Sequence, residues 1–129
     1  MKSEKRREER FVEPGKVNAK EICAISGILD DISQSGCKVH FSVPVTINLE
    51  NDYVLSVLFS RRVPSFKMEL LCHPQWYKVT DNITEIGFEI LNSPTTPELN
   101  SYIQTLKAEA SEKLEVESLL KDQDVVFVK

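Results

Sequence analysis

Two short polar stretches of the sequence have the residue types and spacing to bind an anionic ligand rich in hydrogen-bonding groups. The first covers residues 5–10, where Arg6 and Arg10 are four apart and therefore share a face in a helical turn, or grip two sides of a ligand from an extended arm. A guanidinium is a planar fork of donors that fits phosphate oxygens or the acceptor edge of guanine, and its flat face stacks on a base. Lys5 and Arg7 add positive charge beside them. Taken alone, the stretch is more typical of a solvated, charged tail.

The second stretch reads DISQSG and covers residues 31–36. If a strand continues this far, alternation points Asp31, Ser33 and Ser35 to one side. Asp accepts hydrogen bonds from the ring N–H and amine of guanine, Ser donates to phosphate or accepts from an amine, and Gly36 lets the backbone approach a ligand closely. Taken alone, this spacing is a common turn signal.

Runs of alternating apolar and polar residues predict that residues 17–94 form a small antiparallel β-barrel or sandwich. Between residues 37 and 43 the apolar side chains alternate with Lys38, His40 and Ser42, which is the period of a strand with one wet face. Further runs, at 66–72 and 83–91, alternate in the same way. The apolar members that we expect to face the core are Cys37, Val39, Phe41, Val43, Phe66, Met68, Leu70, Cys72, Ile86, Phe88 and Ile90.

The regions on either side of this β-rich part differ from it in composition. Residues 1–16 form a basic arm with few apolar side chains and a Pro-Gly turn signal at its end, so we expect it to be flexible. Residues 95–121 are expected to form an amphipathic helix, with Thr96 as its cap and Pro97 at its first position. Its apolar stripe consists of Leu99, Tyr102, Ile103, Leu106 and Ala110.

Length, charge and cysteine usage narrow the class of protein. A chain of 129 residues suits one domain, and its net charge of −4 argues against a surface that binds DNA or RNA. The three cysteines cannot all pair and form no CxxC motif, which indicates reduced thiols in a cytoplasmic protein and no metal site. The charged N-terminus is not a signal peptide, and no apolar run approaches the ~20 residues of a membrane span, so we expect no membrane insertion. The sequence shows no set of nucleophile, base and acid that could form a catalytic site, so we expect that the protein is not an enzyme.

Together and in this order, the two polar stretches resemble the PilZ domain family. The family pattern pairs RxxxR with [DN]xSxxG, and the matching positions are Arg6 and Arg10 for the first motif and Asp31, Ser33 and Gly36 for the second. The run EIGFEIL is also similar to the closing strand of the family, where a glycine precedes an apolar-acidic run. The resemblance covers most of the chain and implies a mainly β fold, a six-stranded antiparallel β-barrel with a C-terminal α-helix packed at one end.

PilZ domains are known as receptors for the bacterial second messenger cyclic di-GMP, a ligand with two phosphates and two guanines. The resemblance implies that this ligand, and no other cofactor, is bound by Arg6, Arg10, Asp31, Ser33 and Gly36, with Lys5, Arg7 and Ser35 in auxiliary positions. It also implies that the arm becomes ordered on binding and passes the signal to an unidentified protein partner in motility, biofilm or virulence regulation. The alternative is a PilZ-like adaptor that docks a protein partner and binds no nucleotide.

Overall fold

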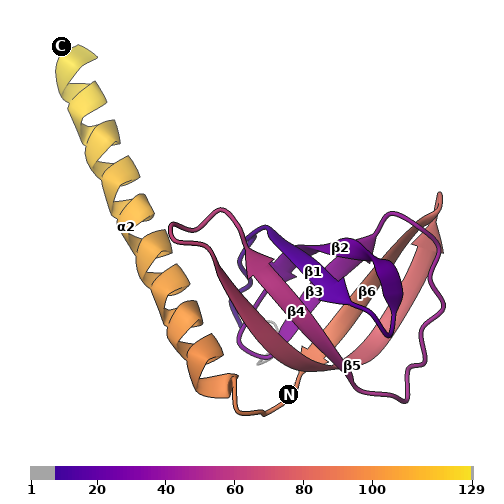
Figure 1. Ribbon diagram of the computed structural model, residues 1–129. Helices are drawn as coiled ribbons and strands as arrows, with labels where there is room; N and C mark the ends of the chain where they lie inside the picture. Colours follow the sequence, from indigo (N-terminus) through magenta and orange to yellow (C-terminus); the bar gives the residue numbers. More distant parts are fainter. Residues whose placement is uncertain (1–7, 129) are drawn as a thin grey trace.

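Six antiparallel strands close into a barrel, and one long helix follows them (Figure 1). The computed structural model describes residues 8–128, with side chains to residue 119. The strands are β1 (Gly15–Ala19), β2 (Cys23–Ile32), β3 (Gly36–Phe41), β4 (Tyr53–Phe59), β5 (Phe66–Thr80) and β6 (Ile83–Ile90), and the helix is α2 (Thr96–Val128). The prediction of a mainly β fold with a six-stranded barrel and a C-terminal helix is confirmed.

The barrel closes because β6 inserts between β3 and β5, and β1 pairs with both β2 and β4. The order around the barrel is β1-β2-β3-β6-β5-β4, and every pair is antiparallel. Closure leaves no strand edge open to further pairing, which distinguishes this fold from a sandwich.

The barrel interior is filled by the alternating apolar residues of the strands. Val39 and Phe41 of β3, Leu70 of β5 and Ile86 of β6 are at most 1% exposed. Val43, Phe66 and Ile90 pack at the edge of this core and are only partly buried. The period-2 patterns therefore predicted the inward faces correctly.

Strand β5 is much longer than the run at 66–72 from which it was predicted, because it continues through Pro74 to Thr80. Pro74 lies opposite Phe88, whereas Trp76 lies opposite Gly87, so one extra residue, Gln75, forms a bulge in this pair. A bulge is one of the few places where a strand accepts proline, which has no N–H to donate.

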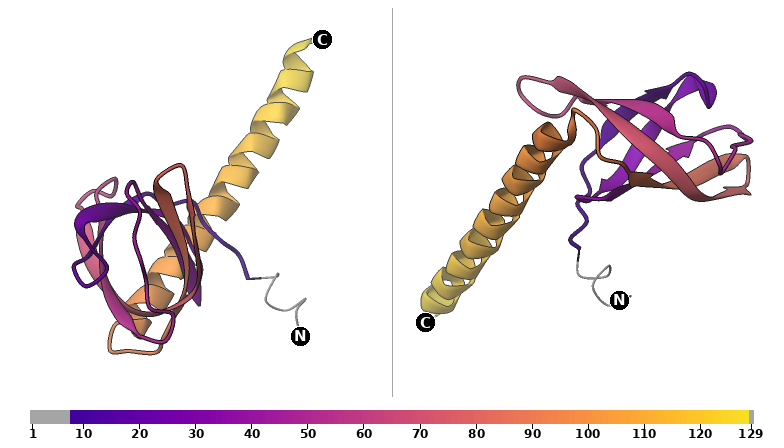
Figure 2. Two further views of the ribbon diagram at one scale, coloured as in Figure 1. Left: turned by 90° about the vertical axis from the view of Figure 1, so that its right-hand side faces the viewer. Right: turned by 90° about the horizontal axis from the view of Figure 1, so that it is seen from below.

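Helix α2 packs on the barrel through its first turns and then projects away from it (Figures 1 and 2). The expected stripe is confirmed for Leu99, Tyr102, Ile103 and Leu106, which are all buried. The helix extends to Val128, beyond the expected end at residue 121, so the terminal apolar residues are helical and do not form a strand. Within the described residues, no helix combines the length and apolar character that a membrane crossing requires.

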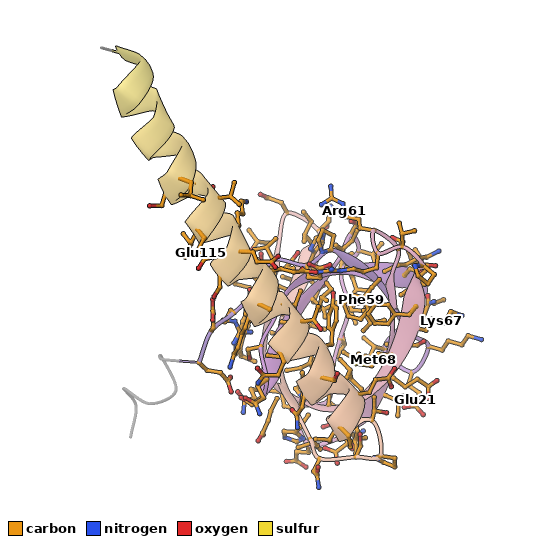
Figure 3. The ribbon with its side chains drawn as sticks, turned by 90° about the vertical axis from the view of Figure 1, so that its left-hand side faces the viewer. Glu21, Phe59, Arg61, Lys67, Met68 and Glu115 are labelled. Atoms are coloured by element: carbon orange, nitrogen blue, oxygen red, sulfur yellow. The ribbon has the colours of Figure 1, made fainter. Side chains whose placement is uncertain are left out.

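An aromatic cluster attaches α2 to the barrel. The ring of Tyr102 lies 4.8 Å from that of Phe59 and 5.2 Å from that of Phe66, measured between centroids. Figure 3 shows Phe59 on the side of the barrel that α2 covers. Offset and edge-on contacts of this kind add to the free energy of apolar burial, so the cluster fixes where the helix leaves the barrel.

Arg62, in the loop between β4 and β5, joins three parts of the chain. Its guanidinium donates to Glu13 Oε2 at 2.8 Å and to both carboxylate oxygens of Glu109 at 2.7 and 2.9 Å, and it lies 5.4 Å from the ring centre of Tyr102. The pairs with Glu109 and Glu13 raise the pKa of Arg62, and Arg62 lowers the pKa of Glu109. Arg62 therefore links the segment before β1 and helix α2 to the barrel.

Candidate functional site

The segment that carries Arg10 is attached to the barrel next to β2. Phe11 and Ile32 exchange two backbone hydrogen bonds, of 2.8 and 2.9 Å, and Phe11 packs against the core. This short bridge aligns the residues before Phe11 with the end of β2. Arg10 is consequently placed beside the DISQSG stretch, although the two are about twenty residues apart in the sequence.

The DISQSG stretch is a strand end followed by a tight turn, not a continuous strand. β2 ends at Ile32, and the backbone N–H of Ser33 donates to Gly36 O at 2.8 Å. The Ser33 hydroxyl, fully buried, accepts from the Gly36 N–H at 3.1 Å. The strand therefore does not continue far enough for alternation to align Asp31, Ser33 and Ser35; instead, the turn brings the hydroxyls of Ser33 and Ser35 to the same carboxylate oxygen.

Gly36 lies close to the backbone of β6. A Cβ at this position would lie 3.1 Å from Phe88 O, 3.7 Å from Arg10 Nη1 and 3.8 Å from Ser33 Oγ. Glycine thus lets the turn approach the backbone of β6 closely, with Arg10 and Ser33 in ordinary contact range.

Arg10 and Asp31 form the centre of the site. The Nε and Nη2 atoms of Arg10 donate to Asp31 Oδ1 at 3.0 and 2.7 Å, and the two side chains are 47% and 25% exposed. The structure therefore brings one residue of each predicted motif into direct contact. Both groups remain accessible to a ligand that offers its own acceptor to the arginine and its own donors to the aspartate.

A carboxylate that the sequence patterns did not single out, Glu8, completes the polar cluster. Its Oε1 accepts from Ser33 Oγ at 2.9 Å and from Ser35 Oγ at 2.6 Å. Ser35, proposed as an auxiliary residue, is exposed. Glu8 thus lies over the same turn whose hydroxyls were expected to face a ligand.

One cross-strand row extends this cluster over the outer face of the barrel. Asp31 lies opposite Lys38, Lys38 opposite Gly87, and Gly87 opposite Trp76. Two bulges create this row, since Asp30 and Gln75 are the extra residues that turn Asp31 and Trp76 outward. The indole of Trp76 lies directly on Gly87, where any Cβ would overlap it. The row therefore places the indole ring of Trp76 on the same outer face as the charged side chains of Asp31 and Lys38.

A cavity of about 350 Å³ opens over this row. Its charged side chains in the described part of the chain are three carboxylates, from Glu8, Asp31 and Glu89, and two cations, from Arg10 and Lys38. An anionic ligand therefore needs further positive charge, or the displacement of a carboxylate. The full lining consists of Glu8, Arg10, Asp31, Ser35, Gly36, Cys37, Lys38, Gln75, Trp76, Gly87, Phe88 and Glu89.

Three of the predicted residues, Lys5, Arg6 and Arg7, lie outside the described residues. Sequence reasoning also missed Glu8, Lys38 and Trp76. Lys38 was predicted to be an outward strand residue but had no assigned role, and Trp76 depends on a bulge that no local pattern indicates. Among residues 8–128, no three His, Cys, Asp or Glu side chains are grouped as a metal site would require.

No protein-family model matches the sequence, and no curated protein sequence is significantly similar to it. Solved structures do match the fold. One is the inhibitor of motility MotI/DgrA from Bacillus subtilis, with a TM-score of 0.63 and 11% identity over 80% of this chain and 51% of that one. Another is YcgR from Escherichia coli in complex with c-di-GMP, with a TM-score of 0.63 and 18% identity over 84% of this chain and 49% of that one.

The chain spans about half the length of each of these two proteins. At these identities the likeness concerns the fold. Both are PilZ-domain proteins, and the closed barrel with its C-terminal helix therefore has a PilZ-like fold.

Proposed function

We propose that this chain is a cyclic di-GMP receptor domain that passes the second-messenger signal to a protein partner through its N-terminal arm. The observation that carries the proposal is the meeting of the two motifs, with Arg10 bonded to Asp31 beside Ser33 and Gly36 on one open cavity. The likeness in fold to YcgR, which was solved with c-di-GMP, supports the same ligand.

Each group in the cavity has a chemical role toward such a ligand. Arg10, together with Arg6, donates to a phosphate or to the acceptor edge of a guanine, whereas Asp31 accepts from the guanine ring N–H and amine. Trp76, which is 43% exposed, offers a surface on which a base can stack. Lys5, Arg7 and Lys38 supply charge against the phosphates.

The proposed output is a change in the arm, because the arm contacts both the cavity and the helix junction. Arg10 lies at the ligand site and Glu13, three residues later, binds Arg62 next to α2. A ligand that replaces Asp31 as the partner of Arg10 changes the contacts of this segment. The ordering of the arm that the family resemblance implies also concerns residues 1–7, which lie outside the described residues. The partner is a protein of motility, biofilm or virulence regulation in the cytoplasm, where Cys23, Cys37 and Cys72 stay reduced.

Calorimetric titration of the purified chain with cyclic di-GMP tests this function, with GTP and GMP as controls. We expect a dissociation constant in the micromolar range, equivalent to about −8 kcal/mol, and much weaker binding of the mononucleotides. Trp76 is the only tryptophan of the chain, so its fluorescence gives an independent signal from the cavity wall. Absence of both signals at roughly millimolar ligand contradicts the proposal.

A second candidate, a PilZ-like adaptor that binds a protein and no nucleotide, is favoured by one observation. The described lining of the cavity has more carboxylates than cations, and Arg10 is already paired with Asp31. The two candidates differ in the titration above. An adaptor gives no heat with cyclic di-GMP and leaves the emission of Trp76 unchanged.

A further inference from the structure

The Glu8 carboxylate accepts the hydrogen bonds that the hydroxyls of the turn can donate to an anion. Its Oε1 accepts from the hydroxyls of Ser33 and Ser35 at 2.9 and 2.6 Å, so one anionic oxygen takes both donors of the turn. Hydrogen bonds from a hydroxyl to an anionic oxygen are stronger than those between neutral groups, so this contact competes with any other anion at the same place.

The turn does not need Glu8 for its own closure. The Ser33 hydroxyl has a second acceptor, Gly36 O at 3.1 Å, and itself accepts from the Gly36 N–H at 3.1 Å. It therefore stays satisfied inside the protein when Glu8 leaves. For the Ser35 hydroxyl, Glu8 is the one acceptor within the described part of the chain. Removal of Glu8 consequently frees Ser35 and leaves the turn intact.

The position of Glu8 also divides the space around the turn. It lines the cavity beside Trp76 and, together with Ser35, a second cavity of about 350 Å³ against the start of α2. The wall of this second cavity includes Gln34, Asn92 and Asn100. Glu8 and Ser35 are therefore shared by the two cavities, and a change in the position of the Glu8 side chain alters both of them.

We propose that Glu8 competes with the ligand for the turn and thereby sets the affinity of the site, with the Ser35 hydroxyl as the donor that Glu8 occupies. An anionic phosphate oxygen of the ligand must replace the Glu8 carboxylate at Ser35. This inference rests on the proposed function, because the anion is taken to be a phosphate of cyclic di-GMP. It adds Glu8 to the residues that decide how tightly the ligand binds, and it gives the auxiliary residue Ser35 a defined role.

Glu9 provides a matched control for the test. It is the adjacent residue of the same arm, carries the same charge, is exposed and makes no side-chain hydrogen bond or ion pair in the described structure. We expect Glu8→Ala to bind cyclic di-GMP about three- to tenfold more tightly than the natural chain, and Glu9→Ala to change binding less than twofold at physiological salt. In the Glu8→Ala background, Ser35→Ala should reverse the gain, because it removes the freed donor.

Amide chemical shifts of the free proteins give a readout that does not depend on the ligand. Glu8→Ala should move the Ser35 and Gly36 resonances, while Glu9→Ala leaves them in place. Equal gains for both alanine variants, or weaker binding by Glu8→Ala, overturn the role of Glu8 and leave the receptor function standing. If the resonances move but neither the natural chain nor any variant binds at roughly millimolar ligand, the receptor function fails, and this inference fails with it.

Discussion

Arg62 and Glu109 form a two-pronged ion pair between the β4–β5 loop and helix α2, with both carboxylate oxygens bonded at 2.7 and 2.9 Å. The same guanidinium forms an ion pair with Glu13, whose side chain is 14% exposed, and lies over the ring of Tyr102. The helix is therefore held to the barrel by a charged junction beside the aromatic cluster. This junction connects the arm to α2 through one side chain.

Replacement of Arg62 by alanine should loosen this junction. The change leaves Glu13 partly buried without its cation, and we expect the free energy of unfolding in urea to fall by about 1–3 kcal/mol. Arg61→Ala is the control, because Arg61 is exposed and points outward in Figure 3. Equal losses for the two variants would show that the junction contributes nothing specific.

The Arg62–Glu109 pair should make stability depend on pH in the acid range. Arg62 lowers the pKa of Glu109 below its ordinary 4.5, so the folded state favours the ionised carboxylate. A lowered pKa in the folded state contributes stability above the ordinary pKa, and this contribution is lost as the pH falls through the lowered value. We expect the natural chain to exceed Glu109→Gln in melting temperature at pH 7, with the gap closing as the pH falls below 4.5. A gap that is constant down to pH 2 contradicts the pairing.

Tyr102→Phe should be neutral or slightly stabilising. The Tyr102 hydroxyl is buried and has no hydrogen-bond partner among the described residues, and burial, with the nearby Glu13 carboxylate, raises the pKa of Tyr102. Removal of an unpaired buried hydroxyl ends its desolvation cost and keeps the ring contacts, so we expect a change within about 0.5 kcal/mol or a small gain. Thermal unfolding measures it, and a loss above ~1 kcal/mol would mean that the hydroxyl is bonded.

Arg10→Ala should weaken cyclic di-GMP binding by roughly 1.5–3 kcal/mol, because one charge-assisted contact with the ligand is lost. Folding should change little, since the Arg10–Asp31 pair is largely exposed. Calorimetry and thermal melting of the same samples separate the two effects. Arg6→Ala is expected to lose binding in the same range, on the motif alone. A variant that binds normally but melts much lower would assign the arginine a structural role.

Gly87→Ala should move the indole of Trp76 off the outer face of β6. A Cβ at Gly87 overlaps this partly exposed indole, so the ring must shift, and we expect a changed emission maximum at a cost of about 1–3 kcal/mol. Gly15→Ala is the matched control, because its Cβ meets Val57 and Leu58 on the other side of the barrel and should leave the emission unchanged. An unaltered spectrum for Gly87→Ala contradicts the stacking of Trp76 on Gly87.

Local periodicity was sufficient to predict the elements of this fold and their buried faces. Val39 and Phe41 alternate with Lys38 and His40, and the helix stripe from Leu99 to Leu106 recurs every three to four residues. Such patterns depend only on which face of an element meets the core, and the spacing of apolar residues along the sequence indicates that face. Arg10, Asp31, Ser33 and Gly36 were predicted from the resemblance to the PilZ family pattern, and the structure places them next to one another.

Only the tertiary structure decided which side chains surround the predicted motifs. Asp31 and Trp76 face outward because single-residue bulges at Asp30 and Gln75 reverse the alternation of their strands, and a bulge depends on pairing with a distant strand. Glu8 reaches Ser33 and Ser35 because Phe11 pairs with Ile32, a contact between segments about twenty residues apart. The sequence by itself therefore determined the β-rich region, its buried faces, the helix and the motif residues. Long-range strand pairing closed the barrel and determined that Glu8 and Trp76 complete the cavity.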